Sequence, residues 1–455
     1  MNLKQQKYLQ PALLLPLVGC GATEQVDAIQ PNVILIMTDD LGYSDISCYG
    51  GTNAQTPNID KLAADGIMFT DYHSNGAVSS PTRAALMTGK YQQRVGVTGV
   101  ITAAKHREKG LALEEITIAE RLSELGYSCG MFGKWHLGYP AAFNPVYQGF
   151  DEFKGFVAGN IDYHSHIDEA GYFDWWNGAE LDRESKGYIT NLITQNSLNF
   201  IMHNNPNKTD KPFFLYVPYP APHYPYQGEN DEPVREEGNK KYIRQYDKEK
   251  GLEIYKEIIE VTDHGIGEIV KMVNALGIAE NTMIIFCSDN GAGRGYGDNG
   301  GYRGHKGTVY EAGHRVPGII KYPAVIAPGQ KSDIPFMGMD FFPTFVDMAG
   351  GKLTAKEGLD GVSFLDFFKT GNAPAARDLF WGHGNKVAMR SKDGWKLVIE
   401  KPKGEDWKYE LFNLNTDQFE TTDLSSSETE RTAKMLEAVK AWEADVYNNS
   451  TKRVS

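Results

Sequence analysis

The segment from Ser79 to Gly89, SSPTRAALMTG, combines a helix start with side chains that can act on an anion. Ser79 stands where a helix cap belongs, and Pro81 suits the first turn, because the N–H that proline lacks would have no partner there. The free N–H groups and the positive end of the helix dipole would then face a ligand near Ser79, which predicts an anion site. Arg83, one turn further on, can fold back over the same place. An ordinary capped helix is the alternative interpretation.

Two similar apolar segments, residues 32–38 and 281–288, are each followed by a pair of oxygen-bearing side chains. These side chains are Asp39, Asp40, Asp289 and Asn290. Continuous apolar runs are typical of parallel strands buried on both faces, and ligand sites of open α/β sheets lie at the carboxyl ends of such strands. Because only hard oxygen donors are present, the set favours calcium or magnesium over zinc, and we expect calcium, because it accepts irregular geometry and more ligands. Aspartates that form turns or cap helices are the alternative.

Further polar residues follow two other predicted strands. Lys134 and His136 occupy alternate positions after the strand at residues 127–132, so both can point into one pocket. His223 lies in a proline-rich loop after the strand at residues 213–217. Solvated loop charges and a structural histidine would explain these residues individually. Gathered at one sheet edge with the serine helix, the strand ends would provide a cation, an anion cradle, a nucleophile and an acid, which suits hydrolysis of a charged ester.

Three segments resemble signatures of a known family, the type I sulfatases. Residues 79–89 resemble the first signature, in which a Cys or Ser is oxidised after translation to formylglycine. Residues 133–138, GKWHLG, resemble the second signature, and residues 304–317 resemble a later block with Lys-Gly and Glu-x-Gly-x-Arg-Val-Pro. The resemblance covers nearly the whole chain after its first 30 residues. It implies an alkaline phosphatase-like fold, a sulfuric ester hydrolase, and a maturase that forms the formylglycine.

The resemblance also implies roles for individual residues in the attack on sulfur. Hydrated formylglycine made from Ser79 would be the nucleophile, and Arg83 would help to position it. Lys134 would hold oxygens of the sulfate and of formylglycine. His136 would contact the formylglycine hydroxyl and help to release sulfate afterwards.

The leaving alcohol and the metal involve other residues. By the same resemblance, His223 together with Lys306 would protonate the departing alcohol. A divalent metal, for which calcium is our expectation, would act as Lewis acid and template. Its ligands would be Asp39, Asp40, Ser79, Asp289 and Asn290.

Other functions remain open on the sequence alone. A phosphate or phosphonate monoester hydrolase of the same superfamily would need a similar site for a tetrahedral oxyanion, whereas sulfate transfer is less favoured. A non-catalytic glycan-binding lipoprotein is the alternative if Ser79 stays unmodified, because serine without a neighbouring base is a poor nucleophile. Ser79 can also be an engineered replacement of cysteine. A conventional serine hydrolase is not indicated, because no Gly-x-Ser-x-Gly turn surrounds Ser79.

The stretch from residue 144 to residue 188 lacks regular periodicity and is rich in aromatic residues. Long irregular loops in compact domains are often functional, and aromatic rings with scattered polar groups suit stacking on sugars. Aromatic packing beneath a long loop is the alternative. A glycine-rich segment, residues 291–304, adds two arginines that either contact substrate or are solvated. The candidate substrate-binding residues are His164, His166, Trp176, Arg294 and Arg303.

The chain has 455 residues, 41% of them hydrophobic, with a formal net charge of −13 and four cysteines. This composition predicts a large globular core, argues against nucleic acid as a partner, and leaves too few cysteines for a disulfide framework. Residues 1–30 resemble an export leader with a lipobox that ends at Cys20, and lipidation there would be the link to a membrane. We expect a periplasmic protein or outer-membrane lipoprotein of a Gram-negative bacterium. The expected substrate is a sulfated polysaccharide, first a carrageenan-type galactan and second a glycosaminoglycan.

The predicted fold class is α/β. After the leader at residues 1–30, a large, mostly parallel sheet flanked by helices would occupy residues 31–350, as in the alkaline phosphatase-like superfamily. A connector follows at residues 351–377. Residues 378–455 combine short strands with a final helix, which predicts a small α+β domain with a short antiparallel sheet.

Overall fold

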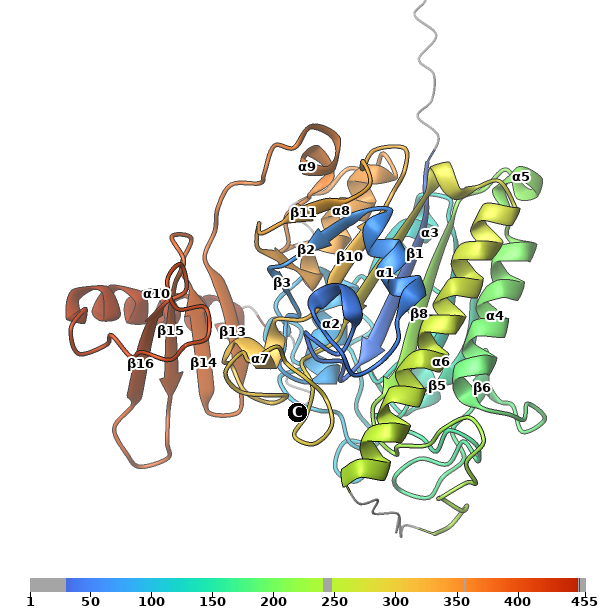
Figure 1. Ribbon diagram of the computed structural model, residues 1–455, viewed down its shortest axis with the longest axis horizontal. Helices are drawn as coiled ribbons and strands as arrows, with labels where there is room; N and C mark the ends of the chain where they lie inside the picture. Colours follow the sequence, from blue (N-terminus) through green and yellow to red (C-terminus); the bar gives the residue numbers. More distant parts are fainter. Residues whose placement is uncertain (1–29, 240–247, 355–356, 449, 451–455) are drawn as a thin grey trace, which may run out of the picture.

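The chain forms a large α/β body and a smaller sheet with one helix, so the predicted fold class is confirmed (Figure 1). The computed structural model describes residues 30–239, 248–354, 357–448 and 450. All of the predicted leader except Gln30 lies outside these residues, and so does Cys20. Within the described ranges, no helix is both long and apolar enough to cross a membrane.

A sheet of ten strands runs through the large body in the order β11-β2-β10-β9-β1-β8-β4-β5-β6-β7. Its centre is parallel, with β1 between β8 and β9, and with β4 and β5 beyond β8. β10 is antiparallel to β9, which makes the sheet mixed toward that edge. The strands are β1 (Asn32–Asp39), β2 (Ile67–Phe69), β4 (Ser128–Lys134), β5 (Glu152–Phe156), β6 (Trp176–Asn177), β7 (Glu180–Leu181), β8 (Phe213–Pro222), β9 (Thr282–Ser288), β10 (Gly318–Lys321) and β11 (Gln330–Ser332).

Helices cover both faces of this sheet, which explains why its central strands are apolar along their length. On β4, Cys129 contacts α3 (Ile118–Glu124), whereas its neighbour Gly130 faces α4 (Ile189–His203) on the opposite side. α4 runs beside the long α6 (Lys248–Ala275) (Figure 1). On the other face, α3 packs with α8 (Phe341–Met348). The remaining helices of the large body are α1 (Pro57–Ala64), α2 (Ser79–Thr88), α5 (Pro206–Thr209), α7 (Glu311–His314) and α9 (Leu365–Thr370).

A second sheet and several short elements complete the fold. β13 to β16 form an antiparallel meander that packs against α10 around its own core, which contains Trp381, Leu397 and Val439. These elements are β13 (Leu379–His383), β14 (Lys386–Arg390), β15 (Trp395–Glu400), β16 (Lys408–Asn413) and α10 (Thr429–Asn448). A two-stranded sheet joins β3 (Tyr72–His73) to β12 (Phe336–Met337), and 3-10 turns lie at Ser47–Tyr49, Ala141–Phe143, Pro145–Tyr147, Ala279–Asn281 and Gly338–Asp340.

The start of α2 differs from the prediction that Ser79 caps this helix. Val78, with an extended backbone (φ −148°, ψ 160°), takes the cap position, and Ser79 is the first helical residue. The Ser79 side chain is therefore not used as a cap and remains available to the residues around it. The predicted end is confirmed, because Gly89 adopts a left-handed conformation (φ 66°) and donates to the Ala85 carbonyl.

Candidate active site

Ser79 and Arg83 lie on the same side of α2, and both are buried. Arg83 Nε donates to Ser79 Oγ at 2.8 Å, so the prediction that the arginine folds back over the serine is confirmed. The same guanidinium donates to Asp289 Oδ2 at 2.9 Å and to the Lys134 carbonyl at 3.1 Å. Arg83 therefore ties the side chain at position 79 to the ends of β4 and β9.

The carboxylates at the ends of β1 and β9 converge, as the matched register of these parallel strands requires. The Asp40 backbone N–H donates to Asp289 Oδ1 at 3.2 Å, and Asn290 Nδ2 donates to Asp40 Oδ1 at 2.7 Å. Two oxygens, Asp39 Oδ1 and Asn290 Oδ1, are buried and have no hydrogen-bond partner among the described residues. A cluster of hard oxygen donors with unused lone pairs fits a cation such as calcium.

Two lysines and a histidine surround the carboxylates. Lys134 Nζ donates to Asp39 Oδ2 in a fully buried pair. Lys306 Nζ lies 2.6 Å from Asp40 Oδ1 and 2.8 Å from Oδ2. His223 Nε2 lies 3.6 Å from Asp40 Oδ2. Lys134 ends β4, Lys306 lies in the loop after β9, and His223 directly follows β8, so the structure gathers the predicted strand-end residues at one place.

The carboxylates differ in proton affinity because their neighbours differ. Burial raises the pKa of Asp39 to about 7, the charges of Asp289 and Asp40 add to this effect, and Lys134 opposes it. Burial also acts to raise the pKa of Asp40, but Lys306 and His223 outweigh it and lower this pKa. The pKa of Asp289 is lowered as well, because Arg83 and Lys134 outweigh its burial. Of the three carboxylates, Asp39 is thus the one whose negative charge is least compensated by neighbouring cations.

His136 is held as a neutral ring with one nitrogen unpaired. Its Nε2 donates to the Ile101 carbonyl at 3.0 Å, and its Nδ1 is buried without a partner in the part of the chain that the structure describes. Burial, with Lys134 and Arg83, lowers the pKa of His136 well below its usual value. A Cβ on Gly159 would lie 2.8 Å from His136 Nε2, so a glycine is required beside the ring. The imidazole is therefore fixed with an acceptor lone pair.

His223 has the opposite arrangement of its two nitrogens. Nδ1 lies 2.7 Å from the Tyr224 carbonyl, which can only accept, so Nδ1 carries the proton of the neutral ring and Nε2 faces Asp40. Burial and the charge of Lys306 lower the pKa of His223 to about 3. Protonation of Nε2 is therefore favoured only when additional negative charge enters the site.

Comparison with known proteins shows which class of ester this site hydrolyses. A family model described as Sulfatase matches residues 31–351, and one described as N-sulphoglucosamine sulphohydrolase, C-terminal, matches residues 300–443. The chain belongs to the sulfatase family. It is thus a sulfuric ester hydrolase, and sulfatases generally use a formylglycine and a divalent metal.

Curated sulfatases and solved structures match most of the chain. N-acetylgalactosamine-6-sulfatase of Rattus norvegicus is 30% identical over 413 residues, which cover 85% of this chain and 74% of that protein. Arylsulfatase A of Homo sapiens is 32% identical over 348 residues, which cover 71% of this chain and 65% of that protein. The crystal structure of Ps i-CgsB in complex with k-i-k-neocarrahexaose has a TM-score of 0.80 and 28% identity, and covers 94% of both chains.

The two histidines of the aromatic loop are engaged in holding this sulfatase loop together. His166 is buried, donates through Nε2 to the Gly187 carbonyl at 2.9 Å, and packs on the Trp175 ring. His164 Nε2 lies 3.0 Å from the Gly228 carbonyl. These contacts favour the packing interpretation of the loop for both histidines.

Trp176 occupies a different place from the histidines. It is half-buried, its Nε1 donates to Asp174, and it lines a pocket of about 290 Å³ together with Arg107 and Tyr172. The guanidinium of Arg107 stacks 3.9 Å from the centre of the Tyr172 ring. Trp176 therefore lines a pocket, whereas the two histidines are bonded to backbone carbonyls.

The two predicted arginines, Arg294 and Arg303, lie in different surroundings. Arg303 donates to Glu410 Oε1 at 2.8 Å and stacks over Tyr310, so it joins the large body to β16. Arg294 is exposed, and its Nε lies 2.8 Å from His305 Nε2, one residue before Lys306. Arg294 is therefore exposed near Lys306, whereas Arg303 is occupied by its contact with β16.

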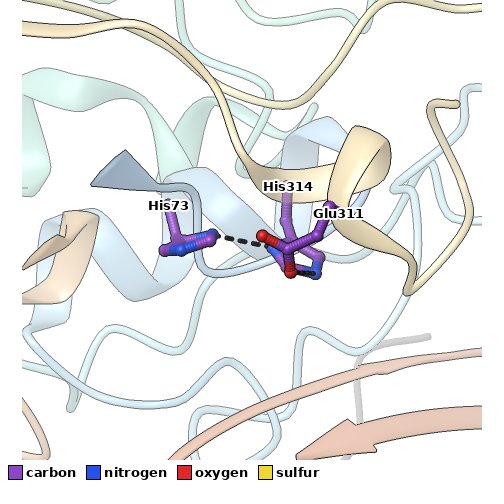
Figure 2. Close-up of side chains that lie close together, drawn as sticks. All are labelled: His73, Glu311 and His314. Carbon is purple, nitrogen blue, oxygen red and sulfur yellow. Dashed lines mark hydrogen bonds and ion pairs between the residues drawn. The ribbon is translucent and has the colours of Figure 1, made fainter. Parts of the chain in front are cut away.

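A buried cluster that sequence reasoning missed lies where the second sheet meets the large body. His73, Glu311 and His314 place ligand-type atoms within 4.8 Å of one another (Figure 2). The two Nδ1 atoms of the histidines are 3.0 Å apart. Lys396 Nζ, from β15, lies 2.8 Å from Glu311 Oε1 and 3.2 Å from His314 Nε2. Because this buried ammonium already neutralises the carboxylate, we interpret the cluster as an ion-pair network that joins the second sheet to the large body.

Proposed function

We propose that this sulfatase removes sulfate from a sulfated glycan by means of a formylglycine formed from Ser79 and a bound calcium ion. The observation that carries the proposal is the setting of Ser79, whose Oγ accepts from Arg83 at 2.8 Å while the same guanidinium holds Asp289 at 2.9 Å. A nucleophile at this position would be fixed between a permanent cation and the oxygen-rich cluster at the strand ends.

The chemistry of the side chains at the strand ends favours a hard cation. Calcium would be held by oxygens of Asp39, Asp40, Asp289 and Asn290, with an oxygen of residue 79. The unused oxygens of Asp39 and Asn290, both hard donors, support this assignment. When bound, the ion would polarise the sulfate oxygens and provide a template for attack.

Different residues of the chain would then orient the nucleophile, accept its proton and stabilise negative charge. Once residue 79 is converted, its hydrated aldehyde would supply the attacking hydroxyl. Arg83 would orient this hydroxyl, and the unpaired Nδ1 of His136 would be available to accept its proton. The ammonium groups of Lys134 and Lys306 stabilise negative charge on the sulfate oxygens.

Departure of the alcohol requires a proton donor on the other side of sulfur. His223 Nε2 is unprotonated in the substrate-free site, because burial and Lys306 lower the pKa of the ring to about 3. An incoming sulfate ester brings negative charge close to this ring and raises its proton affinity. His223 can therefore take up a proton with the substrate and pass it to the leaving oxygen, assisted by Lys306.

The substrate proposal is a carrageenan-type galactan first and a glycosaminoglycan second. The similarity to Ps i-CgsB, whose crystal structure contains a neocarrahexaose, supports the first. The similarity to N-acetylgalactosamine-6-sulfatase supports the second. The pocket formed by Trp176, Tyr172 and Arg107 offers aromatic surface and a cation, which suits a sulfated sugar.

Sulfate release from a panel of substrates tests this proposal. The protein, co-expressed with a serine-competent maturase, should desulfate carrageenan or glycosaminoglycan oligosaccharides and 4-nitrophenyl sulfate. Ser79→Ala should abolish both activities. A phenylphosphonate ester hydrolysed faster than every sulfate ester would instead favour a phosphonate monoester hydrolase, and no hydrolysis by the matured protein would favour a glycan-binding role.

We also propose that the protein is exported and lipidated at Cys20. The leader-like composition of residues 1–30 supports this proposal. Export would place the enzyme in the periplasm or on the outer membrane, where large sulfated glycans are met. Membrane fractions should contain the wild-type protein and lose it after Cys20→Ala.

A further inference from the structure

The proposed proton donor, His223, directly follows β8 and contacts the ring of the next residue. The rings of His223 and Tyr224 are stacked, with their centres 4.5 Å apart and their planes inclined by 27°. Attractive ring pairs have centres about 4.5–7 Å apart, and a stack of nearly parallel rings is one of the favoured arrangements. The contact is therefore close enough to hold one ring against the other.

The backbone of His223 is fixed by contacts that do not involve the Tyr224 ring. The His223 N–H donates to the Pro220 carbonyl at 2.9 Å, and the His223 carbonyl accepts from the Tyr163 hydroxyl at 3.0 Å. Both bonds are made by main-chain atoms of the histidine. They fix where the residue lies and leave the orientation of its imidazole to other contacts.

Tyr224 orients this imidazole through two of its groups. Its carbonyl accepts from His223 Nδ1 at 2.7 Å. A hydrogen bond at one ring atom lets the imidazole tilt about that bond, whereas the stacked phenol ring supports the imidazole along its face. Together the two contacts keep Nε2 directed toward Asp40 Oδ2, which lies 3.6 Å away and is paired with Lys306.

The Tyr224 ring has a weaker contact at its far end. Its hydroxyl lies 3.5 Å from Asn160 Nδ2, which is long for a hydrogen bond. Asn160 itself is buried and directly follows Gly159, the residue that lies against His136. The aromatic ring of Tyr224, more than its hydroxyl, is therefore the part that supports His223.

The exposure of Tyr224 makes this contact accessible to mutation. Tyr224 is 39% exposed, whereas His223 is only 6% exposed. Removal of a partly exposed side chain leaves a smaller cavity than removal of a core residue, so the fold should tolerate the change. The effect of the ring on catalysis can thus be measured separately from its effect on stability.

We propose that Tyr224 is a positioning residue for proton donation, whose ring holds the His223 imidazole with Nε2 directed at the leaving oxygen of the substrate. The inference rests on the proposed function. In the step concerned, the bond between sulfur and the leaving oxygen breaks, its electron pair stays on that oxygen, and the oxygen takes the proton from His223 Nε2. Tyr224 itself exchanges no proton, so its loss should matter most for alcohols that leave poorly without one.

The test compares kcat of the matured enzyme for phenyl sulfate and for 4-nitrophenyl sulfate. These esters differ in the leaving group, and 4-nitrophenolate is the more stable anion, which needs a proton less. General acid catalysis contributes about 10²–10⁴-fold, so His223→Gln should lower kcat for phenyl sulfate by about this factor and kcat for 4-nitrophenyl sulfate less. Tyr224→Ala misplaces the imidazole without removing it. It should lower the ratio of the two kcat values about tenfold and leave KM nearly unchanged.

Three further variants separate the ring from the rest of the side chain. Tyr224→Phe keeps the ring and should restore the ratio to near its wild-type value. Tyr224→Leu fills the same place without an aromatic ring, so it serves if Tyr224→Ala fails to fold. Tyr147→Ala removes a tyrosine that is 57% exposed on the 3-10 turn at Pro145–Tyr147, and this matched control should leave the ratio unchanged.

The outcomes separate this role from the proposed function. A lowered ratio in Tyr224→Ala and Tyr224→Leu, restored in Tyr224→Phe, would establish the positioning role. A wild-type ratio in both ringless variants, while His223→Gln lowers it, would refute the role and leave the proposed function intact. Equal losses for the two esters, or a Tyr224→Phe variant as impaired as Tyr224→Ala, would also refute it. A wild-type ratio in His223→Gln would overturn the proton donor of the proposed function, and the role of Tyr224 with it.

Discussion

Replacing Lys306 by alanine is expected to change metal affinity and turnover in opposite directions. Lys306 Nζ lies 2.6 Å and 2.8 Å from the two oxygens of Asp40. Its ammonium group therefore neutralises a carboxylate whose negative charge would otherwise attract the metal ion. Two unit charges about 4 Å apart repel by about 4 kcal/mol at an effective dielectric constant of about 20. Because the Lys306 side chain is 23% exposed, solvent screening reduces this value. We therefore expect Lys306→Ala to bind calcium about tenfold more tightly, which corresponds to about 1.4 kcal/mol.

The same substitution should slow sulfate release. Loss of one donor that stabilises developing negative charge typically lowers kcat by about 10²–10³. Calcium affinity would be measured by calorimetry and turnover with 4-nitrophenyl sulfate. Lys321→Ala, which removes a lysine paired with Asp65 at 3.0 Å, is the matched control and should change neither quantity. Weaker calcium binding by Lys306→Ala would refute the reasoning, because the lysine would then support the metal site instead of competing with it.

Three further predictions concern the metal, the domain contact and the glycan. Since burial raises the pKa of Asp39 to about 7, calcium must displace a proton from this carboxyl group below pH 7. The calcium affinity measured by calorimetry should therefore rise by up to about tenfold per pH unit below pH 7 and level off above it. An affinity that does not change with pH would argue against Asp39 as a ligand. Lys396→Met should lower the free energy of unfolding in urea by about 3–5 kcal/mol, because it removes the cation paired with the buried Glu420 and leaves the buried Glu311 with Arg315 alone. Lys440→Met, in the exposed pair with Glu437, should leave the free energy of unfolding nearly unchanged, and equal losses for the two variants would contradict the network. Trp176→Ala should lower kcat/KM for a sulfated oligosaccharide about tenfold and affect 4-nitrophenyl sulfate less; equal effects would remove Trp176 from substrate recognition.

The catalytic cluster could be predicted from sequence because parallel strands place their carboxyl ends at one edge. Asp39 and Asp289 follow similar apolar runs, and the register of β1 with β9 brings them together. Arg83 could be placed by helical spacing alone, since a residue one turn after Ser79 faces the same side. The predicted helix cap, Ser79, is one residue too late. The actual cap, Val78, makes no side-chain hydrogen bond to the helix, so its residue type does not indicate the helix start.

Contacts between distant segments were beyond the reach of the sequence. His166 and Arg303 sit in segments whose composition suits ligand binding, yet tertiary contacts with Gly187 and Glu410 occupy them. Lys396 lies in an ordinary amphipathic strand, and only the packing of β15 on α7 buries it. His383 likewise lies near Gly307 only because the second sheet packs against the large body. The local sequence around His383 does not predict this contact.

The central claim is that Ser79 becomes the nucleophile, and mass spectrometry of its peptide tests this claim most directly. Protein purified from the native host should yield a Ser79-containing peptide with the mass of the formylglycine aldehyde, and the aldehyde should react with a hydrazine probe. Ser79→Ala protein is the control and should show neither the mass nor the reaction. A peptide with entirely unmodified serine would contradict the account and would favour a protein that binds sulfated glycans without hydrolysing them.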